Sequence, residues 1–363
     1  MSVFEHINGD GYEQVVFCSD DQSGLRAIIA IHSTALGPAL GGTRFFPYPT
    51  EEQALVDVLR LAKGMTYKAA AAGLDLGGGK AVIIGDPRRI KTEELLRAYG
   101  RFVETLGGRY ITAEDVGTAL EDMDVVRRES RWVTGCSRTY GGSGDPSPVT
   151  AWGVLQGIKA CALDVFGDAS LAGRTVALQG VGKVGHALCG YLVEQGAHVT
   201  IGDIDVDNLA RAVSDHGVET TSLAEIHTLP VDIFAPCALG GVVNDDTISQ
   251  FKCKIIAGAA NNQLAREEHG DKLRDLGILY APDFVINAGG LINVEDELRG
   301  YDGERAKKRV EGIYKQLQLI FAISRERNLS TARAAQEHAL ERIRKISRIR
   351  LVRTAEFGPS SSN

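Results

Sequence analysis

Apolar and polar positions follow two different periods in the first part of this chain, and these periods predict its elements. Short runs rich in β-branched residues have the length and composition of strands. These runs span residues 13–18, 26–32, 80–85 and 109–115. Amphipathic stretches at 51–72 and 91–107 predict helices, the first with Thr50 as its N-cap and Gly73 at its end. The pattern favours an α/β domain.

The second part of the chain has a more regular pattern. Apolar strand-like runs alternate with helix-sized segments, which is typical of a parallel, doubly wound sheet. These runs span residues 174–180, 198–203, 231–238, 253–260 and 278–285. The Gly- and Pro-rich segment 139–150 before them has the composition of a hinge, and amphipathic helices are predicted at 305–328 and 331–350.

The amino-acid composition and net charge exclude several classes of protein. With 44% apolar and 24% charged residues in 363, the chain has the make-up of a globular protein. Its net charge of −7 argues against a nucleic-acid or anionic-membrane partner, and no run approaches the ~20 apolar residues of a membrane span. Six scattered cysteines without a C-x-x-C pattern and no signal-peptide pattern favour a cytoplasmic protein with reduced thiols. Eight histidines without ligand spacing predict no metal site.

A glycine-rich loop follows the strand predicted at 174–180. The loop comprises Gly180, Val181, Gly182, Lys183, Val184 and Gly185. In such a G-x-G-x-x-G loop the first glycine permits a tight turn, the second lets pyrophosphate approach and the third allows close helix–strand packing. The helix that opens here offers N–H donors to phosphate. Because a second strand follows at 198–203, the loop predicts dinucleotide binding.

Asp203 ends that second strand, 23 residues after Gly180, where the ribose-binding acid is expected. A carboxylate there bonds a ribose 2′-hydroxyl and repels a 2′-phosphate, so Asp203 predicts NAD as the cofactor. The alternative is that Asp203 merely ends its strand.

The segment "GLDLGGGKAVIIGDP" at 73–87 is not a phosphate loop. Five residues separate Gly73 from Gly79, and Ala81 stands where a P-loop needs Ser or Thr. The glycines at 77–79 are expected to bring backbone close to a small substrate and to place Lys80 in a dry cleft. A lysine there can serve as a general base.

Three charged residues have both a functional and a structural interpretation from the pattern alone. Lys68 shares a helix face with Met65 at the border of an apolar stripe, where a lysine commonly extends to water. Lys80 is either catalytic or a strand residue. Asp115 follows a predicted strand and is either functional or part of an Asp-Val-Gly turn.

An ordered set of motifs between about residues 25 and 300 resembles the glutamate/leucine/phenylalanine/valine dehydrogenase family, nearest its valine and leucine branch. The motifs are "GPALGGTRFFP", "LAKGMTYKAAAAGLDLGGGKAVIIGDP", "AEDVGT", "GDPSPVTAWGV", "GVGKVG", "APCALGG", "GAANNQLA" and "ILYAPDFVINAGG".

The resemblance implies NAD-dependent oxidative deamination and a role for each site residue. Lys68 would hold the substrate α-carboxylate, Lys80 would be the catalytic lysine, and Asp115 would be its proton-transfer partner. Backbone near the substrate would come from Gly41 and Gly42. The nicotinamide side of the cofactor would be lined by Thr150, Asn261 and Asn262.

The same resemblance implies an apolar pocket for the substrate side chain. Its wall would be Leu40, Met65, Ala113, Leu291 and Val294, although ordinary core packing is the alternative for these residues. Glutamate-specific members carry lysine at the position of Leu40, so a buried second carboxylate would have no partner here. We therefore expect a branched-chain aliphatic amino acid, with valine favoured over leucine and isoleucine. A phenylalanine-type enzyme and a non-catalytic NAD-binding sensor are the alternatives.

We predict two α/β domains separated by a cleft. Residues 1–145 would form the substrate domain and residues 146–325 a Rossmann-type, doubly wound NAD-binding domain. C-terminal helices at about 326–350 would pack back on the first domain. The resemblance further implies a homo-oligomer.

Overall fold

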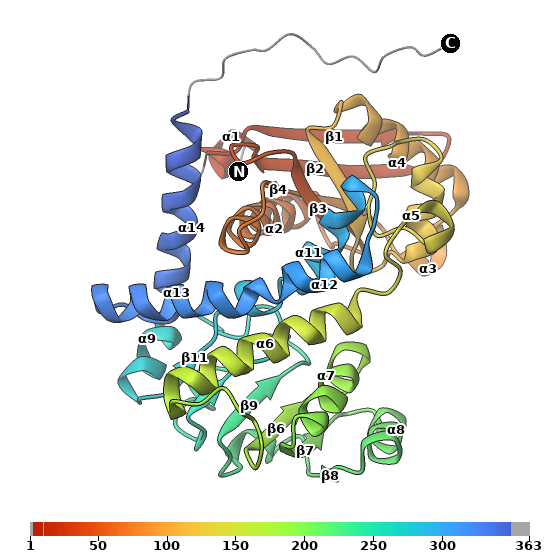
Figure 1. Ribbon diagram of the computed structural model, residues 1–363. Helices are drawn as coiled ribbons and strands as arrows, with labels where there is room; N and C mark the ends of the chain where they lie inside the picture. Colours follow the sequence, from red (N-terminus) through yellow and green to blue (C-terminus); the bar gives the residue numbers. More distant parts are fainter. Residues whose placement is uncertain (1–2, 10, 350–363) are drawn as a thin grey trace.

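The computed structural model describes residues 3–9 and 11–349, so residue 350, the end of the predicted C-terminal segment, lies outside the described residues. Two sheets occupy opposite ends of the molecule, and α6 and α13 lie between them (Figure 1). The first sheet is built from strands before residue 115 and the second from strands after residue 174.

The first sheet has the order β1-β2-β4-β3-β5. Strands β1 and β2 pair antiparallel, as do β2 and β4, whereas β3 runs parallel to both β4 and β5. The strands are β1 Gln14–Asp20, β2 Leu25–Ser33, β3 Ala39–Phe46, β4 Gly77–Ile84 and β5 Tyr110–Glu114. Because β3, β4 and β5 run parallel, their carboxyl ends lie on one edge of the sheet.

Helices cover both faces of this sheet, which explains the continuous apolar runs of β2 and β4. The helices are α2 Glu51–Ala71, α4 Glu93–Thr105 and α5 Leu120–Arg127, with short α1 Val3–Ile7 and α3 Pro87–Ile90. Ile28 and Val82 pack in the cluster that contains α2 residues. Their neighbours Ile29 and Ala81 pack with residues of α4 on the other face. Alternate residues of each strand are therefore buried by different helices.

Helix α2 begins and ends where the sequence predicts. The Thr50 hydroxyl accepts a hydrogen bond from the Gln53 amide at 3.2 Å, and Glu51 and Glu52 stand in the first turn. Gly73 follows the helix with a left-handed φ of +75°. The N-cap bond satisfies one free amide of the helix terminus, and the positive φ suits glycine.

The glycines at 77–79 lie inside β4, which therefore begins three residues before the strand run predicted at 80–85. A Cβ on Gly78 would lie 2.1 Å from the amide nitrogen of Thr66 on α2, and one on Gly79 would lie 2.7 Å from the Tyr110 ring. Other parts of the protein, rather than a ligand, therefore fill the space beside these glycines. Gly78 allows α2 to pack directly onto the sheet.

The second sheet is entirely parallel, with the order β11-β10-β9-β6-β7-β8. Read from β8, this is the doubly wound order 3-2-1-4-5-6 of dinucleotide-binding folds. The strands are β6 Thr175–Gln179, β7 His198–Gly202, β8 Glu219–Thr220, β9 Ile233–Pro236, β10 Ile255–Ile256 and β11 Leu279–Tyr280. The switch point lies between β6 and β9, which is where such sheets bind ligands.

Helices connect and flank these strands. They are α6 Ser147–Phe166, α7 Lys183–Glu194, α8 Val206–His216, α9 Glu268–Asp275, α10 Asp283–Ile286, α11 Gly289–Asp296, α12 Gly303–Val310, α13 Gly312–Arg327 and α14 Thr331–Ser347. The helix predicted at 305–328 is two helices, because α12 packs on α11 while α13 packs on α6 and α14, and a turn at Glu311 redirects the chain.

The α6 helix is long and apolar enough to cross a membrane, but it packs inside the protein. It contacts α7, α11 and α13, and half of its most apolar window is buried. Its apolar composition is therefore that of a core helix.

The α14 helix runs from the end of α13 to the first domain, alongside α2 (Figure 1). Arg342 on α14 donates hydrogen bonds to the carbonyl oxygen of Leu74 at 2.6 Å and to Asp75 at 2.8 Å. These bonds join α14 to the turn that follows α2.

The packing at Gly78 generates a stability prediction. Gly78→Ala should lower the thermal unfolding midpoint and cost about 1–3 kcal/mol, because the new methyl group would overlap α2. Gly312→Ala is the matched control, since nothing lies within 4 Å of a Cβ built there. Equal midpoints for the two variants, measured by differential scanning calorimetry, would contradict this account of the glycine.

Candidate active site

A cavity of about 370 Å³ lies between the two domains. From the first domain, residues of α2, β3, β4 and the segment after β5 line it, and the second domain and α14 complete the wall. The lining includes Arg44, Met65, Tyr67, Lys68, Lys80, Asp115, Asn261, Asn262, Asp283, Phe284 and Gln336. The structure thus brings together Met65, Lys68, Lys80, Asp115, Asn261 and Asn262 from the set that the sequence predicts.

Strand alternation directs Lys80 into this cleft. On β4, Lys80 is two residues from Gly78 and from Val82, both of which face α2. The residue is only 4% exposed. Its ammonium forms a hydrogen-bonded ion pair with the Oδ2 atom of Asp115. A buried ammonium requires such a partner.

Asp115 is held as a carboxylate by its surroundings. Burial by itself raises the pKa of this carboxyl, but the Lys80 ammonium, the Val116 amide and the Arg44 guanidinium together hold the pKa below its usual range. The Val116 N–H donates to Oδ1 at 2.6 Å, so each carboxylate oxygen has a different donor.

Lys68 stands on α2 in the same cleft and is half-buried. Its Nζ donates to Asn287 Oδ1 at 2.7 Å, and the Asn287 amide donates in turn to Asn261 Oδ1 at 2.7 Å. Burial lowers the pKa of Lys68 to about 8; Lys80 acts in the same direction, while Asp283 and Asp115 oppose it. The neutral amide partner leaves the ammonium of Lys68 free to pair with an incoming anion.

Four of the predicted pocket residues share one apolar cluster. Leu40 and Leu291 are buried in it, and Met65 and Val294 pack against it. Ala113 lies on β5, 6% exposed. Of these five, Met65 also lines the cavity itself. The structure therefore places Met65 beside Lys68, Lys80 and Asp115, and the role of the other four as pocket wall stays a prediction.

Gly41 and Gly42 lie on β3, next to the cleft residues. A Cβ on Gly41 would lie 1.8 Å from the Gly79 carbonyl oxygen and 3.4 Å from Met65 Cγ. A Cβ on Gly42 would lie 3.0 Å from the Cβ of Asp115. Side chains at these positions would displace β4 or Asp115, which is a structural reason for glycine here.

The loop at 180–185 has the geometry that a dinucleotide phosphate needs. Gly180 has φ +92°, and a Cβ on Gly185 would lie 1.9 Å from the Gly180 carbonyl oxygen. Nothing lies within 4 Å of a Cβ built on Gly182, the N-cap of α7, and no side chain caps the helix. Val181 is buried, Val184 packs against the core and the Lys183 side chain is exposed. Open amides at a helix N-terminus suit the pyrophosphate of NAD.

Asp203 follows β7 beside this loop. Its Oδ2 accepts the Val181 N–H at 2.7 Å and its Oδ1 accepts the Asp205 N–H at 2.9 Å. The carboxylate therefore lies directly beside the glycine-rich loop. Thr150 lies in the first turns of α6, bonds its own helix at Pro146 and faces Gly290 at the start of α11.

Sequence reasoning missed four polar residues of the cleft region. Asp283 and Asn287 lie inside the motif "ILYAPDFVINAGG", and Arg44 lies inside "GPALGGTRFFP", but their spacing showed no pattern of its own. Asp57 on α2 pairs with Arg44 at 2.8 Å. Arg44 lies four residues after Leu40 on β3, so its side chain lies on the face of the sheet that α2 covers. This placement can be inferred only once β3 is known to be a strand.

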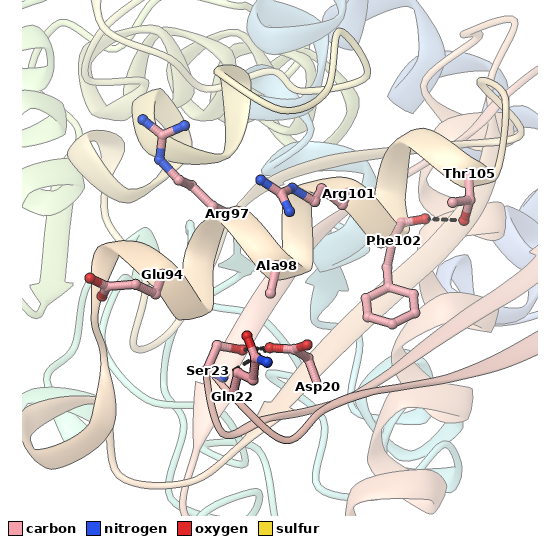
Figure 2. A pocket seen from close by; sticks show the side chains of 9 residues that line it. All are labelled: Asp20, Gln22, Ser23, Glu94, Arg97, Ala98, Arg101, Phe102 and Thr105. Atoms are coloured by element: carbon pink, nitrogen blue, oxygen red, sulfur yellow. Dashed lines mark hydrogen bonds between the residues drawn. The ribbon is translucent and has the colours of Figure 1, made fainter.

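A larger hollow of about 630 Å³ lies elsewhere, between the β1–β2 turn and α4 (Figure 2). Figure 2 shows Arg97 pointing away from the turn that holds Asp20 and Ser23. Arg97 pairs with Glu93 and Glu129, so its charge is already matched. This hollow lacks the buried, converging charges of the interdomain cleft.

Known proteins resemble the chain over nearly its whole length. Residues 12–132 match the Glu/Leu/Phe/Val dehydrogenase dimerisation domain, and residues 201–350 match the glutamate/leucine/phenylalanine/valine dehydrogenase domain. The chain is 56% identical to a leucine dehydrogenase of Bacillus subtilis over 96% of each protein. It is 54% identical to a valine dehydrogenase of Streptomyces virginiae over 93% of this chain and 95% of that one.

The architecture agrees with these similarities. The crystal structure of L-tryptophan dehydrogenase from Nostoc punctiforme superposes with a TM-score of 0.85 and 46% identity, over 96% of this chain and all of that one. Both the sequence matches and the shared fold lead to one conclusion: this chain belongs to the glutamate/leucine/phenylalanine/valine dehydrogenase family.

Proposed function

We propose that the protein catalyses the reversible, NAD-dependent oxidative deamination of a branched-chain aliphatic L-amino acid, with valine favoured and leucine and isoleucine as further substrates. Amino acid, NAD⁺ and water would give 2-oxo acid, ammonia, NADH and a proton. The observation that carries the proposal is the ion pair of Lys80 and Asp115 beside Lys68 in the interdomain cleft.

Lys68 is the residue we assign to the substrate α-carboxylate. Its ammonium is hydrogen-bonded to a neutral amide, Asn287, and lies in the cleft. A carboxylate arriving there gains a charge-assisted bond in a site with little water. Leu40, Met65, Ala113, Leu291 and Val294 are assigned to the side chain, since an apolar wall leaves a second carboxylate without a partner. Gly41 and Gly42 are assigned to the backbone next to the substrate.

Lys80 and Asp115 are assigned to proton transfer. Lys80 would first pass a proton to Asp115 and, as a neutral amine, would then take a proton from water as the water oxygen attacks the substrate iminium carbon. Asp115 would move protons to and from the substrate nitrogen. Their direct hydrogen bond gives a proton path between the two side chains. When NAD is bound, it accepts the hydride that leaves the substrate Cα. Closure of the cleft would exclude water from that step.

The loop 180–185 and Asp203 are assigned to the NAD pyrophosphate and adenosine ribose. Thr150, Asn261 and Asn262 are assigned to the nicotinamide side; the two asparagines line the same cleft as Lys80. Open helix amides support dinucleotide binding, and a carboxylate at the end of β7 supports NAD over NADP.

We extend the proposal to the assembly. Residues 1–145 together with the helices at about 326–350 would move as one body, and residues 146–325 as the other. Similarity of residues 12–132 to a dimerisation domain supports a homo-oligomer. Six free cysteines support a reducing, cytoplasmic location.

A substrate panel tests the reaction class. With NAD⁺, kcat/KM should be highest for valine, leucine or isoleucine, lower for phenylalanine, and at least about tenfold lower for glutamate because its second carboxylate is unpaired. NADH absorbance reports the rate. Preference for phenylalanine would favour the phenylalanine-type alternative, and NAD binding without turnover of any amino acid would favour the sensor.

Replacement of the catalytic amine tests the assignment of Lys80. Lys80→Ala should reduce kcat by about a hundredfold or more, since general acid–base catalysis contributes about 10²–10⁴. NAD affinity, followed by fluorescence, should stay within about threefold of wild type because Lys80 lies outside the phosphate loop. A kcat near that of wild type would remove Lys80 from this role.

The charge of Lys68 predicts a pH dependence of substrate binding. Its pKa of about 8 means that the ammonium is present below this pH and lost above it. The affinity for 4-methylpentanoate, which has leucine's side chain and carboxylate but no amino group, should therefore fall about thirtyfold between about pH 7 and about pH 9.5. Titration calorimetry measures it. In Lys68→Met the affinity should be weak at both values, and an unchanged pH dependence in that variant would exclude Lys68 as the cause.

A further inference from the structure

Arg44 occupies a position in the cleft that the assigned chemistry does not use. It stands on β3 with its side chain 24% exposed, and it lines the same cavity as Lys80 and Asp115. On β3 its neighbour Thr43 points to the opposite face, where its hydroxyl bonds Tyr99 on α4. Strand alternation therefore turns Arg44 toward α2 and the cleft.

The guanidinium of Arg44 bridges two carboxylates from different elements. Its Nη1 donates to Asp57 Oδ2 at 2.8 Å, and its Nε lies 3.5 Å from Asp115 Oδ1. Asp57 is itself fixed, because the Tyr48 hydroxyl donates to the same Oδ2 at 2.7 Å. The Asp57 side chain is 14% exposed, so this ion pair is shielded from water.

Asp115 thus has cationic partners toward both of its oxygens. Oδ2 pairs with Lys80, while Oδ1 faces Arg44 and accepts the Val116 amide. A carboxylate held at both oxygens has little freedom to rotate about its side-chain torsions. The Oδ2 atom of Asp115 therefore keeps a fixed direction toward the Lys80 ammonium.

We propose that Arg44 is a positioning residue for Asp115, oriented by Asp57, and that it keeps Asp115 turned toward Lys80 during proton transfer. The inference rests on the proposed function. It adds a chain of contacts from α2 through β3 to the catalytic pair, whose members are Tyr48, Asp57, Arg44, Asp115 and Lys80.

Charges on every neighbouring element bear on the ionisation of Asp115. Lys80 on β4 and Arg44 on β3 favour its charged form. Lys68 on α2 is also within electrostatic range, as are Glu114 and Tyr110 on β5. Loss of the Arg44 charge removes one of the groups that hold the pKa of Asp115 low, so the proton should be retained to higher pH.

Arg44→Gln tests the inference through a readout that a purely structural ion pair would leave unchanged. We expect kcat for the preferred amino acid to fall by about tenfold, and the acid limb of the kcat pH profile to move upward by about half a pH unit or more. Arg44→Lys retains the charge and should return the limb most of the way to its wild-type position. Arg97→Gln is the matched control, since Arg97 also pairs with two carboxylates but lies on α4, outside the cleft.

Asp57→Asn provides a second variant that keeps the Arg44 charge but weakens its anchor. This variant should lower kcat while NAD affinity stays within about threefold of wild type. If Arg44→Gln does not fold, Asp57→Asn alone tests the inference. A wild-type acid limb in Arg44→Gln, or a wild-type kcat in Asp57→Asn, would overturn the inference. Failure of the proposed function would look different, because the wild-type protein itself would then turn over no amino acid.

Discussion

The ion pair between Lys80 and Asp115 is the interaction on which the cleft depends. Lys80 is buried within a strand and would be costly there without an anion, while Asp115 is exposed enough at the end of β5 to meet a ligand. The pair joins two strands that are not adjacent in the sheet, since β3 lies between them. Everything that sets the distance between β4 and β5 therefore also sets the geometry of the pair.

Three glycines allow the strands and helix α2 to pack closely enough for this ion pair to form. The Gly41 Cα faces the Gly79 carbonyl, the Gly42 Cα faces Asp115, and Gly78 admits α2. Each removes a side chain that would separate the elements carrying charge. Lys68 on α2 and Lys80 on β4 reach one cleft because the helix packs directly against the strand at Gly78. The many glycines of the first domain thus allow close packing of backbone, and the interdomain cleft with its paired charges is the consequence.

Much of this organisation could be predicted from local sequence. The cap at Thr50, the apolar strand run of β2 and the G-x-G-x-x-G turn each depend on neighbouring residues, and the structure confirms all three. Strand β3 could not be predicted in this way, because Gly41 and Gly42 interrupt its apolar run. Without β3, neither the parallel core of the first sheet nor the direction of Arg44 could be known. Asn287 was missed because its bond to Lys68 spans 219 positions of sequence.

The central claim is that Lys80 and Asp115 act as one unit, and a double-mutant cycle on kcat tests it most directly. If the two residues share one proton path, Lys80→Ala combined with Asp115→Asn should reduce kcat by no more than about threefold beyond the more damaging single variant. Independent roles would instead multiply the two losses. Fully multiplicative effects, measured at saturating amino acid and NAD⁺ in correctly folded variants, would contradict the account.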